Sequence, residues 1–280
     1  MKVVKTVAEV QQLLAIPLSN KEVVGFAPTM GALHSGHIAL VKRARKECDA
    51  VAVSIFVNPT QFNDKNDLAR YPRTLDADVQ LLQAAGCDVV FAPEVEEIYP
   101  TPDTRVFDFG MLDKVMEGER RPGHFNGVGQ VVSRLFDIVK PTRAYFGEKD
   151  FQQLAIVREL VHQLRYKVEI VPCPIVREAD GLAMSSRNTL LTPEQRAAAP
   201  LIAKTLFTAV DMVCETDLAT LKKFVVDQIE GNQLLKLEYF DVVNTKTLQP
   251  VYSLDNEGSK QACIAVQAGK IRLIDNMRIS

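Results

Sequence analysis

Short apolar runs alternate with amphipathic stretches over the first two thirds of the chain. Five runs are apolar at nearly every position, which is typical of strands covered on both faces in a parallel sheet. The stretches between them carry the three-to-four-residue apolar spacing of helices that pack on a sheet. We predict strands at 23–27, 50–57, 88–91, 144–146 and 168–172, and helices at 36–47, 74–85, 129–139 and 151–165. This alternation predicts an α/β fold, a Rossmann-like doubly wound parallel sheet.

The pattern changes near residue 176. Helical spacing runs over 193–213, where Thr192 and Pro193 suit a cap and first turn, and again over 217–229. Strand-like segments follow at 236–243, 262–267 and 271–277. We therefore expect a Rossmann-like domain over 1–176 and a smaller C-terminal α+β domain over 177–280.

Composition narrows the class of protein. The 280 residues include 47% hydrophobic and 24% charged residues, as in ordinary soluble globular proteins, and the formal net charge of −2 provides no basic field for nucleic acid. No apolar run approaches the roughly 18 residues that span a bilayer, and the N-terminus lacks the apolar core of a signal peptide. The five cysteines form no C-x-x-C pair. We expect reduced thiols, a cytoplasmic protein, and neither a nucleic acid nor a membrane as partner.

The segment PTMGALHSGH, residues 28–37, directly follows the first predicted buried strand. Gly31 and Gly36 let the backbone approach a ligand closely. Ser35 can cap the next helix, so that its N–H groups and positive dipole end face the carboxyl edge of the sheet. His34 and His37 are three residues apart and can point at the same anion. The segment therefore predicts a phosphate site.

Other interpretations of this segment stay open. A glycine turn before a helix is common without any ligand. The gap between Gly31 and Gly36 is that of a P-loop, but His37 and Ile38 stand where that motif needs Lys and Ser or Thr. Two histidines at this spacing could also bind a metal, although no third ligand lies nearby in the sequence.

Polar residues elsewhere are weaker signals. Lys149 and Asp150 follow a predicted strand, where ligands bind in open α/β sheets, although such pairs are often only solvated. The loop MSSRN, residues 184–188, is as readily an ordinary turn as a site. Gln61 and Gln153 also follow predicted strands, and their amides offer donors and an acceptor to a small hydroxy acid. By themselves both glutamines could equally lie on ordinary surface.

Together these segments match a known family. PTMGALHSGH resembles the HIGH-type signature of the nucleotidyltransferase superfamily, and it is most similar to that of pantothenate synthetases. MSSRN resembles the KMSKS loop of that superfamily, but Ala183 and Ser186 stand where its lysines would be, which argues against a tRNA synthetase. Further segments resemble the family in its own order: VNPTQF, YPRT, EGERRPGHFNGV and FGEKDFQQ. The resemblance covers residues 28–188 and extends more loosely to the C-terminal region.

The resemblance implies an ATP-dependent ligase that condenses (R)-pantoate with β-alanine through a pantoyl-adenylate, releasing AMP and pyrophosphate, in vitamin B5 and coenzyme A biosynthesis. It implies that the first domain binds nucleotide and pantoate and that the second closes over the site. The implied catalytic residues are His37, His34, Lys149 and Arg187. The implied ATP-binding residues are Met30, Gly31, His34, His37, Gly147, Glu148, Lys149, Asp150, Val176, Met184, Ser185, Ser186 and Arg187.

For pantoate and β-alanine the resemblance implies Gln61 and Gln153, with Asn58 and the loop 120–125 shaping that end. ATP chemistry calls for Mg²⁺ on phosphate oxygens, for which Asp78 and Asp150 are the candidate protein ligands. The resemblance also implies a homodimer.

Two other functions remain compatible with the sequence. A nucleotidyltransferase of the same superfamily would use the same histidine-bearing turn to make a dinucleotide or CDP-type product. A catalytically silent ATP-binding homologue would keep the fold, but it should have lost the two histidines or Lys149.

Overall fold

The computed structural model describes residues 1–63, 65–255 and 258–279, and these divide into two compact units. The first unit comprises Met1–Gly110, Gly118–Glu148 and Gln153–Pro174. The second comprises Met111–Glu117, Lys149–Gln152 and Ile175–Ser280. Because the chain alternates between the units, no single cut in the sequence separates them, and the domain boundary at 176/177 stays a prediction.

The first unit is built on a six-stranded sheet in the order β1-β4-β3-β2-β5-β6, and all of its strand pairs are parallel. The order turns back at the centre, where β2 pairs with both β3 and β5. This is the doubly wound α/β fold that the sequence predicts. The strands are β1 (Lys2–Val4), β2 (Val24–Thr29), β3 (Ala50–Ile55), β4 (Val89–Phe91), β5 (Arg143–Gly147) and β6 (Glu169–Cys173).

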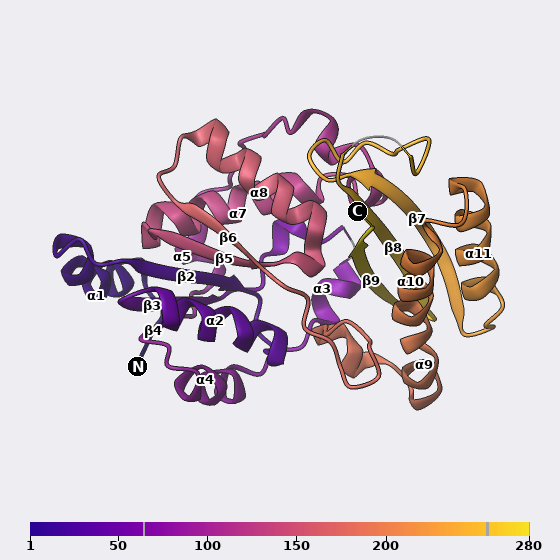
Figure 1. Cartoon of the computed structure of the whole chain (residues 1–280). Helices are drawn as coiled ribbons and strands as arrows, with labels where there is room; N and C mark the ends of the chain where they lie inside the picture. Colours follow the sequence, from indigo (N-terminus) through magenta and orange to yellow (C-terminus); the bar gives the residue numbers. More distant parts are fainter. Residues whose placement is uncertain (64, 256–257, 280) are drawn as a thin grey trace. The chain divides into compact units, whose positions relative to one another are not determined.

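Helices cover both faces of this sheet (Figure 1), with α2 and α4 on one side and α7 and α8 on the other. Because helices cover both faces of the sheet, β2 and β3 are apolar at nearly every position. Val24, Phe26 and Val51 are fully buried. The helices are α1 (Val7–Ser19), α2 (Ser35–Glu47), α3 (Lys65–Arg70), α4 (Leu75–Ala84), α5 (Val95–Ile98), α7 (His124–Val139) and α8 (Phe151–Leu164), with the 3-10 turn η1 (Pro59–Gln61) after β3.

The N-terminal pair β1 and α1 lies outside the predicted elements. The signal for α1 is present in the sequence as a capping box: the Thr6 hydroxyl accepts the Glu9 N–H at 3.3 Å, and the Glu9 carboxylate accepts the Thr6 N–H at 3.0 Å. Helix α7 begins at His124 rather than at 129. The glycines in this region weaken the helical pattern, but Gly127 is required for packing, because a Cβ there would lie 2.4 Å from the Thr60 carbonyl oxygen.

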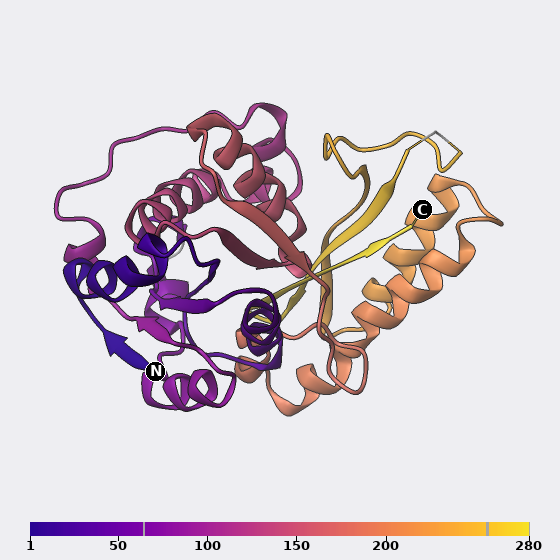
Figure 2. The ribbon, with the colours of Figure 1, turned by 60° about the vertical axis from the view of Figure 1, so that its left-hand side comes forward.

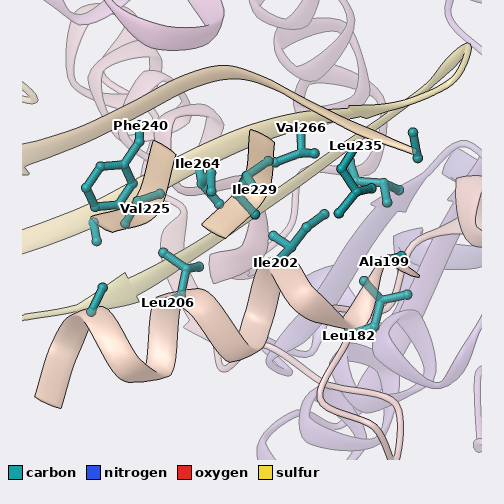
Figure 3. Close-up of a cluster of buried hydrophobic side chains, with 14 of the residues drawn as sticks. Leu182, Ala199, Ile202, Leu206, Val225, Ile229, Leu235, Phe240, Ile264 and Val266 are labelled. Carbon is teal, nitrogen blue, oxygen red and sulfur yellow. The ribbon is translucent and has the colours of Figure 1, made fainter. Parts of the chain in front are cut away.

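The second unit contains an antiparallel sheet in the order β7-β8-β9, with two helices packed against it (Figure 2). In Figure 3, Ile202 and Leu206 of α10 and Ile229 of α11 lie against Ile264 and Val266 of β8, and all five side chains are buried. The elements are η2 (Gly110–Asp113), α6 (Met116–Arg120), η3 (Glu148–Asp150), η4 (Ser186–Leu190), α9 (Pro193–Ala198), α10 (Pro200–Met212), α11 (Leu218–Glu230), β7 (Leu235–Asn244), β8 (Lys260–Ala268) and β9 (Ile271–Arg278). Three of these, η2, α6 and η3, contain residues of both units.

The single helix predicted over 193–213 is wrong, because Pro200 divides it into α9 and α10. Proline has no N–H for the helical hydrogen-bond ladder, so the ladder is interrupted at Pro200, although Ala199 before it keeps helical dihedral angles (φ −55°, ψ −34°). The predicted cap is confirmed: the Thr192 hydroxyl accepts the Gln195 N–H at 3.3 Å. Among the described residues, no helix combines the length and the apolar character needed to cross a membrane.

Candidate active site

The turn after β2 is held from inside the first unit by Asp78. Gly31 (φ +79°) and Ala32 (φ +48°) bend the chain sharply in the left-handed region. The buried Asp78 carboxylate accepts the N–H groups of Ala32 at 2.9 Å and Leu33 at 2.8 Å. A Cβ at Gly31 would lie 3.1 Å from Asp78 Oδ2, so glycine lets the carboxylate approach this closely. Asp78 therefore fixes the backbone that presents the two histidines.

His34 is the N-cap of α2, and the expected cap, Ser35, is instead the first helical residue. His34 Nδ1 accepts the Gly36 N–H at 3.1 Å, and His37 Nδ1 accepts the His34 N–H at 3.4 Å. Both an imidazole and a serine hydroxyl can accept a hydrogen bond from a helix N–H, and in this turn the His34 ring does so. An accepting Nδ1 places the ring proton of a neutral histidine on Nε2, where it can donate to an anion.

The two histidine rings lie together, with centroids 4.1 Å apart. They share the start of α2, whose first N–H groups and dipole favour negative charge. The structure thus brings His34 and His37 together as the sequence predicts. Met30 and Gly31 precede them in the same turn.

A cluster of amides follows β3, the strand beside β2. Asn58, 1% exposed, donates from Nδ2 to Gln61 Oε1 at 3.3 Å and to the Gly127 carbonyl at 3.1 Å. Gln61 Nε2 lies 2.9 Å from the sulfur of Met30. The residue predicted for pantoate is therefore in contact with the turn predicted for ATP.

His124 supports this cluster. Its Nδ1 lies 2.8 Å from the Gln61 carbonyl oxygen, and its Nε2 lies 3.2 Å from Arg121 Nη1. Since the guanidinium can only donate, Nε2 accepts and Nδ1 donates to the carbonyl. The loop 120–125 is expected to shape this end of the site; its histidine contacts the Gln61 backbone, and the role of the loop stays a prediction. Tyr99, which donates to Asn58 Oδ1 at 3.0 Å, was missed, because nothing in the sequence pairs it with Asn58.

The carboxyl end of β5 supplies Gly147 and Glu148 to the first unit. Gly147 has open space around it, since a Cβ there would meet no atom within 4 Å. Gln153 lies in the first turns of α8. The residues of the first unit therefore follow the ends of β2, β3 and β5, three neighbouring strands at the switch point where ligands bind in such sheets.

In the second unit Lys149 lies in η3, and its backbone carbonyl accepts a hydrogen bond from Asn276 Nδ2 at 2.8 Å. The Lys149 ammonium lies 3.6 Å from Asp150 Oδ1, and the Asp150 side chain is 47% exposed. Asn276 is buried in β9 and its Oδ1 accepts from Gln261 Nε2 at 2.7 Å. The amide of Asn276 therefore has a fixed orientation toward Lys149.

The MSSRN loop is attached to the strand-like segment that begins at Val176. The Val176 carbonyl accepts the Met184 N–H at 3.0 Å. Arg177 binds Asp275 with two hydrogen bonds, Nη1 to Oδ2 at 2.7 Å and Nη2 to Oδ1 at 2.9 Å. Burial raises the pKa of the Asp275 carboxyl, and Arg177 acts in the opposite direction. This bidentate pair braces the turn that carries the loop.

Within the loop, Ser185 caps the short helix η4, with its hydroxyl accepting the Arg187 N–H at 3.3 Å. Asn188 Nδ2 donates to the Ala183 carbonyl at 3.1 Å, which closes the loop. Ser186 is largely buried. The second unit thus holds Lys149, Asp150, Val176, Met184, Ser185, Ser186 and Arg187. Asp275, Asn276 and Gln261 were missed, since they lie far along the chain from the segments that they support.

No cluster of three or more His, Cys, Asp or Glu side chains that could hold a metal occurs among the described residues. Both oxygens of Asp78 already accept backbone N–H groups, so its geometry is that of a structural anchor. Asp150 is the more exposed candidate. This donor set forms no protein cage, which fits a Mg²⁺ ion carried mainly by ATP phosphates. The metal-ligand roles of Asp78 and Asp150 stay predictions.

A parallel sheet with an anion-favouring helix start and an adjoining amide cluster at its carboxyl edge defines a nucleotide-binding α/β protein of the doubly wound class. Comparison with known proteins identifies the family. The model of the pantoate–β-alanine ligase family matches residues 2–278. The chain therefore belongs to this family, and it is a ligase that forms a carbon–nitrogen bond.

Individual relatives support the same family assignment. A pantothenate synthetase from Phocaeicola vulgatus is 56% identical over 279 residues, covering 99% of both chains. The crystal structure of a pantothenate synthetase from Thermus thermophilus matches with a TM-score of 0.93 and 44% identity, covering 100% of this chain and 99% of that one. A pantoate–β-alanine ligase from Francisella tularensis, solved with β,γ-ATP and β-alanine, matches with a TM-score of 0.83 and 36% identity, covering 100% and 98%.

Proposed function

We propose that this protein condenses (R)-pantoate with β-alanine to form pantothenate, consuming ATP and releasing AMP and pyrophosphate. Membership of the pantoate–β-alanine ligase family supports the reaction, and the Francisella relative was solved with an ATP compound and β-alanine. One contact carries the proposal: Gln61 Nε2 lies 2.9 Å from Met30 Sδ. This contact brings the Gln61 amide, which can bind a hydroxy acid, next to the turn that can bind a phosphate. The transfer of an adenylyl group from ATP to an acid requires the two sites to adjoin in this way.

In the first half-reaction a pantoate carboxylate oxygen attacks the α-phosphorus of ATP. The bond from that phosphorus to the bridging oxygen breaks, and pyrophosphate leaves with its electron pair. Negative charge on the α-phosphate oxygens is met by His34, His37 and the N–H groups at the start of α2. Donors that are already oriented lower the barrier without reorganising during the reaction.

The remaining phosphates and the base are assigned to residues of the second unit, together with Gly147 and Glu148 of the first unit. Lys149, Ser185, Ser186 and Arg187 bind the β- and γ-phosphates, as the family resemblance implies. The backbone of Val176 contacts adenine, with Met184, Gly147, Glu148 and Asp150 completing the nucleotide site. Mg²⁺, when bound, neutralises phosphate charge. In this proposal the C-terminal domain closes over the site.

In the second half-reaction the neutral amine of β-alanine attacks the carbonyl carbon of pantoyl-adenylate. The new C–N bond forms, AMP departs with the bridging oxygen, and the amine loses a proton. Gln61 and Gln153 orient pantoate, and Asn58 holds the Gln61 side chain through its 3.3 Å contact. Fixing acid and nucleotide side by side accounts for much of the rate gain expected from such an enzyme.

We place this reaction in the cytoplasm and in a homodimer. The five cysteines support the first point, because all of them are free thiols and four are buried. The homodimer follows from the family resemblance.

The test is an incubation of the purified chain with Mg²⁺, ATP, pantoate and β-alanine, with AMP and pantothenate quantified together. Equal amounts of both products are expected, and omitting β-alanine should leave a pantoate-dependent exchange of pyrophosphate into ATP. A product that retains the nucleotide would instead identify a nucleotidyltransferase. ATP binding without any pantoate-dependent pyrophosphate release would identify a non-catalytic homologue.

A further inference from the structure

Three elements of the first unit place Tyr99 beside the amide cluster. Tyr99 ends the short helix α5, where its N–H donates to the Val95 carbonyl at 2.8 Å. Its ring packs on Phe56, the residue after β3, with ring centroids 6.2 Å apart. On the side of α7, the Arg134 guanidinium lies 6.0 Å from the Tyr99 ring centroid, within the range of a cation–π contact. The ring is therefore held by contacts that do not involve its hydroxyl.

The Tyr99 hydroxyl is directed at the side chain of Asn58. It donates to Asn58 Oδ1 at 3.0 Å, whereas the hydroxyl and the N–H of Thr60 reach the same oxygen at 3.1 and 3.4 Å. Burial raises the pKa of the Tyr99 hydroxyl, so this group keeps its proton at neutral pH and remains a donor. Tyr99 is the closest of these three donors to an oxygen whose residue is only 1% exposed.

The backbone partners of Asn58 allow its amide only one orientation. Its Oδ1 faces the Thr60 N–H, which can only donate, and its Nδ2 lies 3.1 Å from the Gly127 carbonyl, which can only accept. Exchanging the oxygen and the nitrogen of the amide would break both contacts. The other hydrogen of Nδ2 then serves Gln61 Oε1, at 3.3 Å.

The orientation of Asn58 in turn decides the orientation of the Gln61 amide. Because Gln61 Oε1 accepts from Asn58, Gln61 Nε2 is directed to the other side, where it lies 2.9 Å from the Met30 sulfur. A thioether is a weak acceptor, so this nitrogen keeps donor capacity for an oxygen of a bound acid. Gln61 is 9% exposed, and an amide turned the wrong way would leave polar groups unsatisfied in a buried place.

We infer that Tyr99 is a positioning residue for the acid substrate, which acts through Asn58 on the donor group of Gln61. The chain of hydrogen bonds runs from the Tyr99 hydroxyl to Asn58 Oδ1 and from Asn58 Nδ2 to Gln61 Oε1. Hydrogen bonds in series polarise one another, so the Tyr99 hydroxyl strengthens the donors that follow it. The inference rests on the proposed function, because it takes pantoate as the acid that Gln61 binds.

Tyr166 is a matched tyrosine in the same unit. Its ring packs edge-on against Phe136 with ring centroids 5.7 Å apart, and its hydroxyl donates to Asp137 Oδ1 at 2.8 Å. Like Tyr99 it is partly buried, and burial raises the pKa of its hydroxyl. Neither Phe136 nor Asp137 is assigned to a substrate. Tyr166→Phe therefore removes a comparable hydroxyl without changing the acid site.

The first test compares Tyr99→Phe with Tyr166→Phe in the full chain by pantoate-dependent exchange of pyrophosphate into ATP. Tyr99→Phe keeps the ring on Phe56 and removes the donor to Asn58. KM for pantoate should rise about three- to tenfold, as expected for the loss of one neutral hydrogen bond, while KM for ATP stays nearly constant. Tyr166→Phe should unfold at a lower urea concentration but keep both KM values. An unchanged KM for pantoate in Tyr99→Phe, or an equal rise in Tyr166→Phe, would overturn the inference.

The second test is a double-mutant cycle that asks whether Tyr99 acts through Gln61. Exchange rates at subsaturating pantoate give kcat/KM even for weakly active variants. In a Gln61→Ala background, where the end of the hydrogen-bond chain is missing, Tyr99→Phe should have almost no further effect on kcat/KM for pantoate.

A purely structural role for Tyr99 predicts instead that its substitution costs the same factor in both backgrounds. That result would overturn the inference and leave the proposed function intact. A wild-type chain without any pantoate-dependent exchange would overturn the proposed function, and the inference with it.

Discussion

Asn276 Nδ2 donates a hydrogen bond of 2.8 Å to the backbone carbonyl of Lys149, so a buried residue of the last strand holds the lysine assigned to the ATP phosphates. Its neighbour Asp275 binds Arg177, which braces the turn carrying the MSSRN loop. Two consecutive residues of β9 therefore support two separate segments assigned to ATP.

Asn276→Asp should weaken the use of ATP without unfolding the protein. The change keeps the size of the side chain but removes the donor to Lys149, so the carboxylate repels that carbonyl and displaces the lysine. Since small displacements of a positioned group cost up to a hundredfold, kcat/KM for ATP should fall about ten- to a hundredfold.

Steady-state kinetics with ATP and pantoate varied separately would measure this, and KM for pantoate should stay nearly constant. Asn232→Asp is the matched control, because Asn232 uses its oxygen as an acceptor for the Leu234 N–H and an aspartate can do the same. Equal kinetics for Asn276→Asp and wild type would remove the positioning role.

His37→Ala should lower kcat about a hundred- to a thousandfold, the usual effect of losing one oriented donor to a transition-state oxyanion. Single-turnover formation of pantoyl-adenylate isolates the step concerned. His162→Ala, an exposed histidine near the end of α8, serves as control and should be fully active. Wild-type turnover in folded His37→Ala would exclude this histidine from the chemistry.

At His34, capping and catalysis can be separated by two substitutions. His34→Ala removes the acceptor for the Gly36 N–H and should cost about 1 kcal/mol of stability as well as activity. Asparagine is a good N-cap, so His34→Asn should unfold at nearly the wild-type denaturant concentration while its adenylation rate stays low. Recovery of full activity in His34→Asn would show that His34 acts only as a cap.

Gln61→Glu should impair pantoate more than ATP. The new carboxylate would face the pantoate carboxylate, and like charges at short range repel in a partly buried site. We expect KM for pantoate to rise at least tenfold, with a small change for ATP, measured by pantoate-dependent pyrophosphate exchange. Gln83→Glu, on the exposed side of α4, adds the same charge elsewhere and should have no effect. Equal effects of the two substitutions would place pantoate away from Gln61.

Asp103→Asn should destabilise the protein near neutral pH but not in acid. Hydrogen bonds from Arg105, opposed by burial, hold the pKa of the Asp103 carboxyl well below its usual range. Because the pKa of Asp103 is lower in the folded state than in the unfolded state, the ionised carboxylate stabilises the folded protein at pH values above the unfolded pKa of about 3.9. This stabilisation is lost as the pH falls through the folded pKa.

The expected loss at pH 7 is about 1.5–3 kcal/mol, the range for hydrogen bonds to a charged group. Urea unfolding at pH 7 and at successively lower pH values below 4 would measure it, and the gap between variant and wild type should narrow in acid. A difference that stays constant over this range would contradict the assignment.

The core of the fold could be predicted from the sequence because a buried strand or helix has a recognisable apolar pattern in its own residues. Strands β2 and β3 are apolar at nearly every position since helices cover both faces, and α2 shows its buried side in Leu40, Val41 and Ala44. The break at Pro200 and the capping box before α1 are also visible in the local sequence. Apolar spacing continues past Pro200 and therefore predicted a single helix over 193–213, and no helix was predicted over the N-terminal residues that form α1.

The segments that form the site could be predicted from the sequence, but the residues that hold these segments in place could not. The histidine turn, Gln61, Lys149 and the MSSRN loop could be recognised because each is a short contiguous motif. The sequence could not predict that His34 rather than Ser35 is the N-cap of α2. Both side chains can accept a hydrogen bond from a helix N–H, and only the geometry of the turn decides which of them does.

By itself, then, the sequence determined which stretches are buried, the class of fold, and the family, because these depend on neighbouring positions along the chain. Only the tertiary structure decided that Asp78 anchors Ala32, 46 residues away, and that Asn276 holds Lys149, 127 residues away. Such partners depend on strand order and on how loops close, and a hydrogen bond formed between distant segments leaves no periodic pattern in either of them.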